Sequence, residues 1–256
     1  MALKVPIKNN QKLKSVLKQI NDNVTLNTWW YCSNVNAINR MHMNDHGPVH
    51  IKIVSNLALK LLRMLHEHGV ESNVVKDHHL SQDDAEVVVL LAVCLHDIGH
   101  IVHRKDHEPF SVGVALTLLP ELLEDVYEQR EQAILIAEVV HAIFSHDMPI
   151  KPFTIEAGCL KVADALDMEK GRARIPFSIS EPTIHAVSAL AIEEVSVGKG
   201  QEKPICITIK MSNSAGIFQL DNLLKGKVEN SGLAQYVEIV ANLDGEEKKI
   251  IHSYTI

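Results

Sequence analysis

An apolar segment with a histidine and an aspartate at its end constrains this chain more than any other feature. Val87 to Leu95 is an unbroken run of aliphatic residues and one cysteine, and His96 and Asp97 follow it directly. Ser81 opens a helix-capping pattern before this run, and Gly99 ends the helix. A helix that is apolar on every side has to be buried on every side. We therefore expect a bundle of helices packed around this one, with an imidazole and a carboxylate at its buried end.

The spacing of apolar residues predicts further helices up to about residue 180, joined by short loops. Pro48 suits the first turn of one of them, because a proline lacks the N–H that would have no partner there. Trp29 and Trp30 fall in a polar stretch between the first two helices. The expected helices span residues 12–20, 48–69, 81–99, 131–146 and 154–170, with two shorter ones that begin at Pro109 and Pro120.

The pattern changes after Pro182. Apolar and polar residues alternate between Ile205 and Met211 with the period of two that is typical of a strand. One helix is expected before this strand and another after it, followed by two strands around the turn at Asp244-Gly245. We therefore predict a mainly α protein with a helical domain, residues 1–182, and a small α+β domain, residues 183–256. The strands of the second domain are expected to form either a homodimer interface or a lid.

Composition and charge exclude several classes of protein. The 256 residues are 46% hydrophobic and 22% charged, which suits a globular protein with a substantial core. The formal net charge is -7 and no long basic run occurs, so nucleic acid is not an expected partner. The longest apolar run is too short to span a bilayer, the N-terminus lacks the features of a signal peptide, and the four cysteines form no C-x-x-C pair. These features predict a cytoplasmic protein without membrane association.

The buried pair of His96 and Asp97 needs a physical explanation. Burying an unpaired carboxylate costs several kcal/mol unless its pKa shifts until the group is neutral. A divalent metal ion removes this penalty, and histidine and aspartate are among the usual ligands of such ions. The alternative is structural: Asp97 caps a neighbouring helix and His96 hydrogen-bonds a carbonyl. For an isolated pair we would prefer the structural alternative.

The pair is not isolated, because other histidines and an aspartate share the inward faces of predicted helices. His50 lies one turn before Val54 on an apolar stripe, and Asp164 lies in the middle of a helix, where a solvated aspartate is the alternative. His141 also lies on an apolar stripe, and His146 ends the same helix. Five positions apart, these two differ by about 140° around the helix axis, so they are not expected to bind one ion equivalently unless the helix ends between them.

At these residues the chain resembles the HD-domain metal-dependent phosphohydrolases, whose pattern is H…HD…H…H…D on an all-helical bundle. The helix with His50 is similar to the family's first histidine helix, and LLAVCLHDIGH is similar to the helix with the doublet. AIFSHD is similar to the later histidine helix, and KVADALD to the helix with the last aspartate. The four segments occur in the family's order. The resemblance covers roughly residues 40–175 and implies an HD-type helical bundle, with the C-terminal domain outside it.

The resemblance implies one or two divalent metal ions, among which Mn, Fe, Co, Ni, Mg and Zn are not distinguished. The first ion would be held by His50, His96, Asp97 and Asp164. A second ion would use Asp97 as a bridge, together with intermediate histidines. For these we favour His107 with either His146 or His141. His100 is expected to pack beside the ligands, and His103 to lie at the surface.

The resemblance also implies a mechanism, in which a metal lowers the pKa of a bound water to about 7 and the hydroxide attacks phosphorus. His96 and Asp97 would be catalytic through the ions, and positive side chains would bind the other phosphate oxygens. We assign Arg104 and Lys161 to catalysis and His46, Arg104, Arg172 and Arg174 to substrate binding, with Lys105 as a further cation. The alternative for each cation is a solvated surface charge, and for His46 a loop residue without a role.

Three functions compete at this point. The preferred one is hydrolysis of a phosphate ester, so the expected partner is a nucleotide or another small phosphorylated metabolite. The second keeps the metal site but uses two iron ions for an oxygenase reaction, as some relatives of this family do. The third is a non-catalytic metal- or nucleotide-binding regulatory module, against which the intact set of ligands argues.

Overall fold

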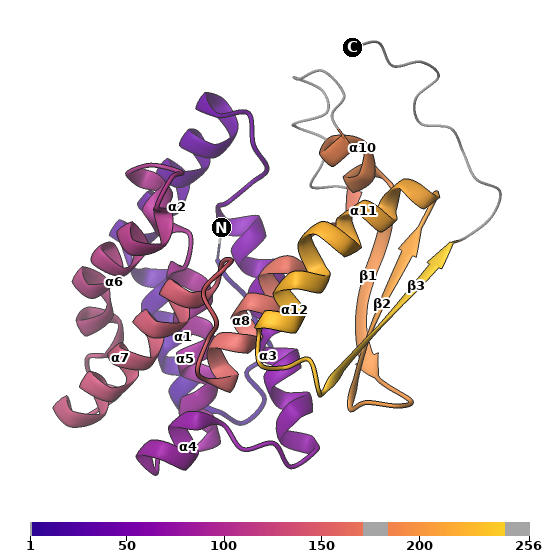
Figure 1. Cartoon of the computed structure of the whole chain (residues 1–256). Helices are drawn as coiled ribbons and strands as arrows, with labels where there is room; N and C mark the ends of the chain where they lie inside the picture. Colours follow the sequence, from indigo (N-terminus) through magenta and orange to yellow (C-terminus); the bar gives the residue numbers. More distant parts are fainter. Residues whose placement is uncertain (1, 171–183, 244–256) are drawn as a thin grey trace.

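The computed structural model describes residues 2–170 and 184–243, and every structural statement below concerns these residues. Figure 1 shows a bundle of helices formed by the N-terminal part of the chain and a smaller unit of helices and strands packed against one side of it. The expected class, mainly helical with a small C-terminal α+β unit, is confirmed. The domain boundary expected at residues 182 and 183 lies outside the described residues.

The bundle begins with helices whose starts are capped by side chains. Asn10 and Asn23 each accept a backbone N–H in the first turn of the helix that follows, and Ser81 and Asp84 form the capping box that the sequence predicts. The elements of the bundle are α1 (Gln11–Asp22), α2 (Val24–Asn34), η1 (Val35–Arg40), α3 (Pro48–Glu67), α4 (Asn73–His78), α5 (Gln82–Leu95), η2 (Ile98–Ile101), α6 (His107–Leu123), α7 (Gln129–Ser145) and α8 (Ile155–Ala165).

Helix α5 forms the centre of the bundle. Every residue from Asp84 to Leu95 is buried, and the helix packs against α1, α3, α7 and α8. Its buried Glu86 is paired with Arg63 through two hydrogen bonds of 2.6 and 2.8 Å. No helix among the described residues is long and apolar enough to cross a bilayer. Because α5 is surrounded by other helices, its C-terminal end places His96 inside the protein.

The stretch with Trp29 and Trp30, for which no helix was expected, forms α2 and continues into the π-helical turn η1. Trp30 explains this, because it is a core residue with an exposed fraction of 2%. Its indole Nε1 donates a hydrogen bond of 2.8 Å to the carbonyl oxygen of Cys94 in α5. The segment therefore packs on the central helix, and its polar residues had masked this in the sequence.

Two further helices differ in extent from the expectation. A single helix, α6, replaces the two expected between residues 109 and 129. Pro109 lies in its first turn, where no N–H partner is needed, and Pro120 lies in its last turn, where it removes only one hydrogen bond. Helix α8 ends at Ala165 rather than at Lys170.

The C-terminal unit contains a three-stranded sheet in the order β1-β2-β3. Strand β1 (Ile192–Lys199) pairs antiparallel with β2 (Ile205–Met211), and β2 pairs parallel with β3 (Val237–Leu243). We had not predicted β1, because two glutamates interrupt the alternation of apolar residues there. The strand expected after Asp244-Gly245 lies outside the described residues. The remaining elements are α10 (Ile184–Leu190), η3 (Ser214–Gly216), α11 (Ile217–Gln219), η4 (Leu220–Lys225) and α12 (Gly226–Asn230).

The C-terminal unit packs against α3 and α8 of the bundle. In Figure 1 the helical segment that ends in α12 runs beside α8. Gly158 of α8 permits this approach, because a Cβ atom there would lie 2.6 Å from the carbonyl oxygen of Ser231 and 3.1 Å from Leu233. The unit is thereby held against the helix that bears Asp164.

Candidate metal centre

Histidine and aspartate side chains from α3, α5, α6, α7 and α8 converge beyond the C-terminal end of α5. His96 is the C-cap of this helix and is fully buried, and Asp97 follows it. Nδ1 of His96 donates a hydrogen bond of 2.8 Å to the carbonyl oxygen of Val93. The carbonyl fixes the orientation of the ring, and Nε2 therefore faces the other members of the cluster.

His146 and His107 approach the same aspartate from two other helices. His146 is the C-cap of α7, and its Nδ1 donates to the carbonyl oxygen of Ile143 at 2.6 Å, which repeats the arrangement of His96. His107 is the first residue of α6, and its Nδ1 is 2.8 Å from Nη1 of Arg104. In both histidines Nε2 points to Oδ1 of Asp97. The distance to this oxygen is 3.8 Å for His146 and 3.2 Å for His107.

Helices α3 and α8 contribute His50 and Asp164. Nε2 of His50 lies 3.2 Å from Nε2 of His96 and 3.4 Å from Oδ1 of Asp164. Nδ1 of His50 donates to Oδ2 of Asp167 at 2.6 Å. A carboxylate on the far nitrogen of a histidine is the usual support of a metal ligand, because it fixes the ring and raises the basicity of the ligating nitrogen.

Asp97 lies between two groups of histidines. Its Oδ2 atom faces the first group, His46 at 2.7 Å, His96 at 3.3 Å and His50 at 3.5 Å. Its Oδ1 atom faces the second group, His107 at 3.2 Å, His100 at 3.7 Å and His146 at 3.8 Å. One carboxylate thus reaches both groups, as a ligand that bridges two ions does.

The imidazole ring of His100 has no hydrogen-bond partner in the described part of the chain, although the residue is fully buried. Its Nε2 atom lies 3.7 Å from Oδ1 of Asp97. Its ring stacks on that of His46, with 4.6 Å between the centroids. Because buried polar atoms are nearly always paired, two unpaired nitrogens here indicate that a partner belongs between His100 and Asp97. A metal ion is such a partner.

The donor atoms are spaced as the ligands of a metal ion are. Nitrogen and oxygen ligands lie about 2.0–2.2 Å from zinc, so ligands of one ion are roughly 3 to 4 Å apart. Among residues 2–170 and 184–243, four sets of three donor groups have ligand atoms within 4.8 Å of one another. The sets are His46, His50 and Asp97; His50, His96 and Asp164; His96, Asp97 and His146; and Asp97, His100 and His107. The cluster can therefore hold a divalent ion.

The histidines that face the carboxylates retain protons when no metal is bound. Burial alone would lower the pKa of His50, but hydrogen bonds to Asp164 and Asp167 raise this pKa to about 9. Burial also opposes the charge of His96, but the negative charge of Asp97 and a hydrogen bond to Asp164 raise its pKa to about 10. Any metal that binds here has to displace these protons.

The pKa values of His100 and His146 are lowered, in contrast to those of His50 and His96. Burial lowers the pKa of each to about 3, and a neighbouring positive charge at His96 adds to the effect at His146. Both rings are therefore neutral at neutral pH, which is the form that binds metals. Burial alone would raise the pKa of Asp97, but the positive charges of His96 and His46 hold it well below its usual range.

A lysine of the C-terminal unit completes the cluster. Nζ of Lys227, in α12, lies 2.7 Å from Oδ2 of Asp164 and 3.3 Å from Oδ1 of Asp147. Burial would lower the pKa of Lys227, but the charges of Asp164 and Asp147 raise it. Burial would likewise raise the pKa of Asp164, but the charge of Lys227 holds it well below its usual range. The two groups are thus an ion pair that is largely shielded from solvent.

Other residues selected from the sequence lie apart from this cluster. Nε2 of His141 accepts a hydrogen bond from the backbone N–H of Phe153, and its ring stacks on Phe153. Nζ of Lys161 donates to three backbone carbonyls of residues 145, 147 and 150, at 3.3, 3.0 and 2.6 Å. Lys161 therefore organises the turn after α7, and the catalytic role expected for it stays a prediction. Arg172 and Arg174 lie outside the described residues.

Sequence reasoning did not select Asp167, Asp147 and Lys227, which the structure places at the cluster. His46, expected to bind substrate, and His100, expected to pack beside the ligands, both lie near Asp97. Asp167 had a local signal, since it follows Asp164 by three residues in KVADALD. Lys227 had none, because it lies in a different unit, 63 residues from its partner.

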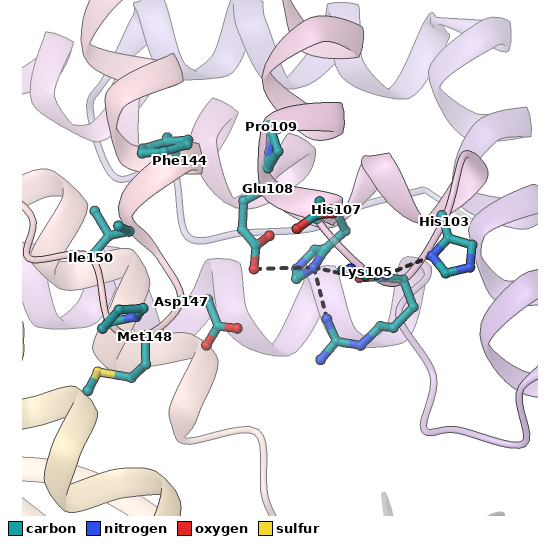
Figure 2. A pocket seen from close by; sticks show the side chains of 12 residues that line it. His103, Lys105, His107, Glu108, Pro109, Phe144, Asp147, Met148 and Ile150 are labelled. Carbon is teal, nitrogen blue, oxygen red and sulfur yellow. Dashed lines mark hydrogen bonds and ion pairs between the residues drawn. The ribbon is translucent and has the colours of Figure 1, made fainter.

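A cavity of about 650 Å³ opens beside the cluster, with His107 in its wall. Figure 2 shows His107 and Glu108 between His103 on one side and Asp147, Met148 and Ile150 on the other. The cavity is also lined by the cationic residues Arg104 and Lys105 and by the exposed apolar side chain of Phe144. The volume suits a small molecule.

The comparisons with known proteins agree with this geometry. The family model of the HD domain matches residues 49–169. The uncharacterized protein MJ1020 of Methanocaldococcus jannaschii is 42% identical over 243 residues, which cover 95% of this chain and 93% of the relative. The chain belongs to the HD-domain family. Its matched segment begins one residue before His50 and includes the whole cluster apart from His46 and Lys227. HD domains are mostly metal-dependent hydrolases, and the His/Asp cluster is the part of this one that can bind a metal.

Proposed function

We propose that this HD-domain protein is a metal-dependent phosphohydrolase that cleaves a phosphate ester of a small molecule. The observation that carries the proposal is the position of Asp97, whose two carboxylate oxygens face two groups of histidines. Two ions that share one carboxylate suit an in-line displacement at phosphorus, because both the attacking and the leaving oxygen need stabilisation of charge. The match to the HD domain supports the same class of reaction.

Two ions would share the cluster around Asp97. His50, His96, Asp164 and Asp97 would hold the first ion, and His107, His146, His100 and Asp97 would hold the second. Bound ions of this kind supply a water with a pKa of about 7 and polarise the phosphoryl oxygens. Asp167 holds the ring of His50, and backbone carbonyls hold those of His96 and His146. His46, whose side chain is 18% exposed, contacts Asp97 at 2.7 Å.

The cavity beside His107 is the proposed substrate site. Arg104 lines this cavity and contacts Nδ1 of His107, so its guanidinium is close to the place where phosphate would bind. Arg104 and Lys105 can bind phosphate oxygens that the metals leave free. Phe144 and Met148 can cover an apolar or flat part of the substrate. A nucleotide or another small phosphorylated metabolite has both a phosphate group and such an apolar or flat part.

The free thiols of all four cysteines favour the reducing cytosol as the place of this reaction.

The proposal is tested by metal analysis followed by a hydrolysis screen. The protein is loaded with Mn²⁺, Co²⁺, Ni²⁺, Mg²⁺, Zn²⁺ or Fe²⁺ and assayed for release of phosphate from nucleotides and sugar phosphates. Metal-dependent release that a chelator abolishes is the expected result. Absence of release with every metal would reject the proposal, and consumption of oxygen by the iron-loaded protein would point to the oxygenase instead.

Metal binding should release protons and strengthen as the pH rises. The reason is that His50 and His96, with pKa values raised to about 9 and about 10, hold protons at neutral pH that the ion has to displace. We expect the affinity for Mn²⁺ to increase from about pH 6 to about pH 8. Titration calorimetry in two buffers of different ionisation enthalpy measures both the affinity and the number of protons released. An affinity that is independent of pH would contradict the expectation.

A further inference from the structure

One member of the cluster comes from outside the HD domain. Lys227 belongs to α12, whereas the match to the HD domain ends at residue 169. We propose that Lys227 is a positioning residue of the metal centre, through which the C-terminal unit orients Asp164. The inference rests on the metal centre proposed above and extends it to the part of the chain that the family model does not cover.

The first support is the way in which Asp164 divides its two oxygens. Oδ1 faces Nε2 of His50 at 3.4 Å and Nε2 of His96 at 3.7 Å, which is the side of the metal. Oδ2 faces Nζ of Lys227 at 2.7 Å. A hydrogen-bond partner on the outer oxygen holds a metal-binding carboxylate in one rotamer, and loss of such a partner typically weakens metal binding by about 10- to 100-fold.

The second support is that Lys227 is itself held in place. Its side chain is only 14% exposed, and Nζ makes a further contact of 3.3 Å with Oδ1 of Asp147. The next residue, Val228, is buried and anchors α12. The close approach of Ser231 to Gly158 fixes the end of α12 on the helix that carries Asp164. The lysine is therefore delivered to Asp164 by the packing of two units.

A lysine that acts only through its charge would have the opposite effect on metal affinity. A positive charge close to a divalent ion repels it, so removal of such a lysine would strengthen metal binding. A positioning residue fixes the ligand, so its removal weakens metal binding. The sign of the change therefore separates the two roles.

The experiment compares four variants of the full-length protein by titration of the metal-free form with Mn²⁺. Lys227→Met and Lys227→Gln remove the charge, and Lys227→Arg keeps both the charge and the hydrogen-bond donors. Lys225→Met is the matched control, because Lys225 is an exposed lysine two residues earlier in the same helical segment. We expect binding about 10- to 100-fold weaker for the Met and Gln variants. Binding close to that of the wild type is expected for Lys227→Arg and Lys225→Met.

Circular dichroism of the metal-free proteins identifies the variants that retain the helical fold, and only these are compared. If Lys227→Met or Lys227→Gln folds and binds Mn²⁺ as tightly as the wild type, or more tightly, the positioning role is overturned. An equal loss of affinity in Lys225→Met would overturn it as well, because the effect would then belong to any lysine of this segment. If the wild type binds neither Mn²⁺ nor any of the other five ions of the hydrolysis screen, the metal centre is rejected, and with it the proposed function.

Discussion

Asp97→Ala is expected to abolish both metal binding and hydrolysis of phosphate esters while the helical circular dichroism is retained. Asp97 is the residue that both groups of histidines share, so its loss removes a donor from each of the two proposed ion sites. The substitution leaves α5 itself intact, because its apolar residues from Val87 to Leu95 remain buried. Metal content after gel filtration, release of phosphate and far-ultraviolet circular dichroism are the three measurements.

His141→Ala is the matched control for this experiment. His141 lies in α7, like His146, but its ring faces Phe153 and not the cluster. The control should therefore retain both metal and activity. Turnover by Asp97→Ala at the rate of the wild type would show that the reaction takes place elsewhere in the protein.

Gly99→Ala is expected to destabilise the protein by about 3 kcal/mol and to weaken metal binding. A Cβ atom at Gly99 would lie 2.2 Å from the carbonyl oxygen of His107 and 2.6 Å from the backbone nitrogen of Ser111. Both neighbours are backbone atoms of α6, so the whole first turn of that helix has to move away. His107 would move with it, away from Asp97. Urea denaturation measures the stability, and titration with Mn²⁺ measures the effect on the cluster.

Gly113→Ala provides the comparison. Gly113 lies in α6, the helix that Gly99 approaches, and a Cβ atom added there would have no neighbour within 4 Å. An alanine inside a helix is favoured over glycine by roughly 0.5–1 kcal/mol, so this variant should be slightly more stable than the wild type. Its metal affinity should not change. If the two variants had the same stability, the close approach of α6 to Gly99 would not be the cause of the predicted effect.

The four residues His50, His96, Asp97 and Asp164 could be selected from the sequence for a common reason. Each lies at an inward position, in or at the end of a helix with clear apolar periodicity, where an unpaired polar side chain would be unfavourable. The same periodicity gave most helices of the bundle, including the buried α5. Local pattern is informative here because the bundle is built from contacts between apolar helix faces.

His146 and His141 could not be separated in this way. Helix α7 ends at Ser145, so the direction of His146 is set by the end of the helix and by the carbonyl of Ile143. Periodicity does not locate a helix end to within one residue. Lys227 could not be found at all, because its role depends on how the C-terminal unit packs against α8.

The donor atoms of the cluster are contributed by helices that are distant in the chain, from His50 in α3 to Asp164 in α8. An unfolded chain therefore has no preformed chelate, and an ion that binds the cluster stabilises only the native state. At a free metal concentration of about 100 times the dissociation constant, this linkage adds about 2.7 kcal/mol to the free energy of unfolding. Metal starvation would then leave a larger unfolded fraction exposed to proteases, so the supply of the ion would govern the abundance of the protein in addition to its rate of turnover.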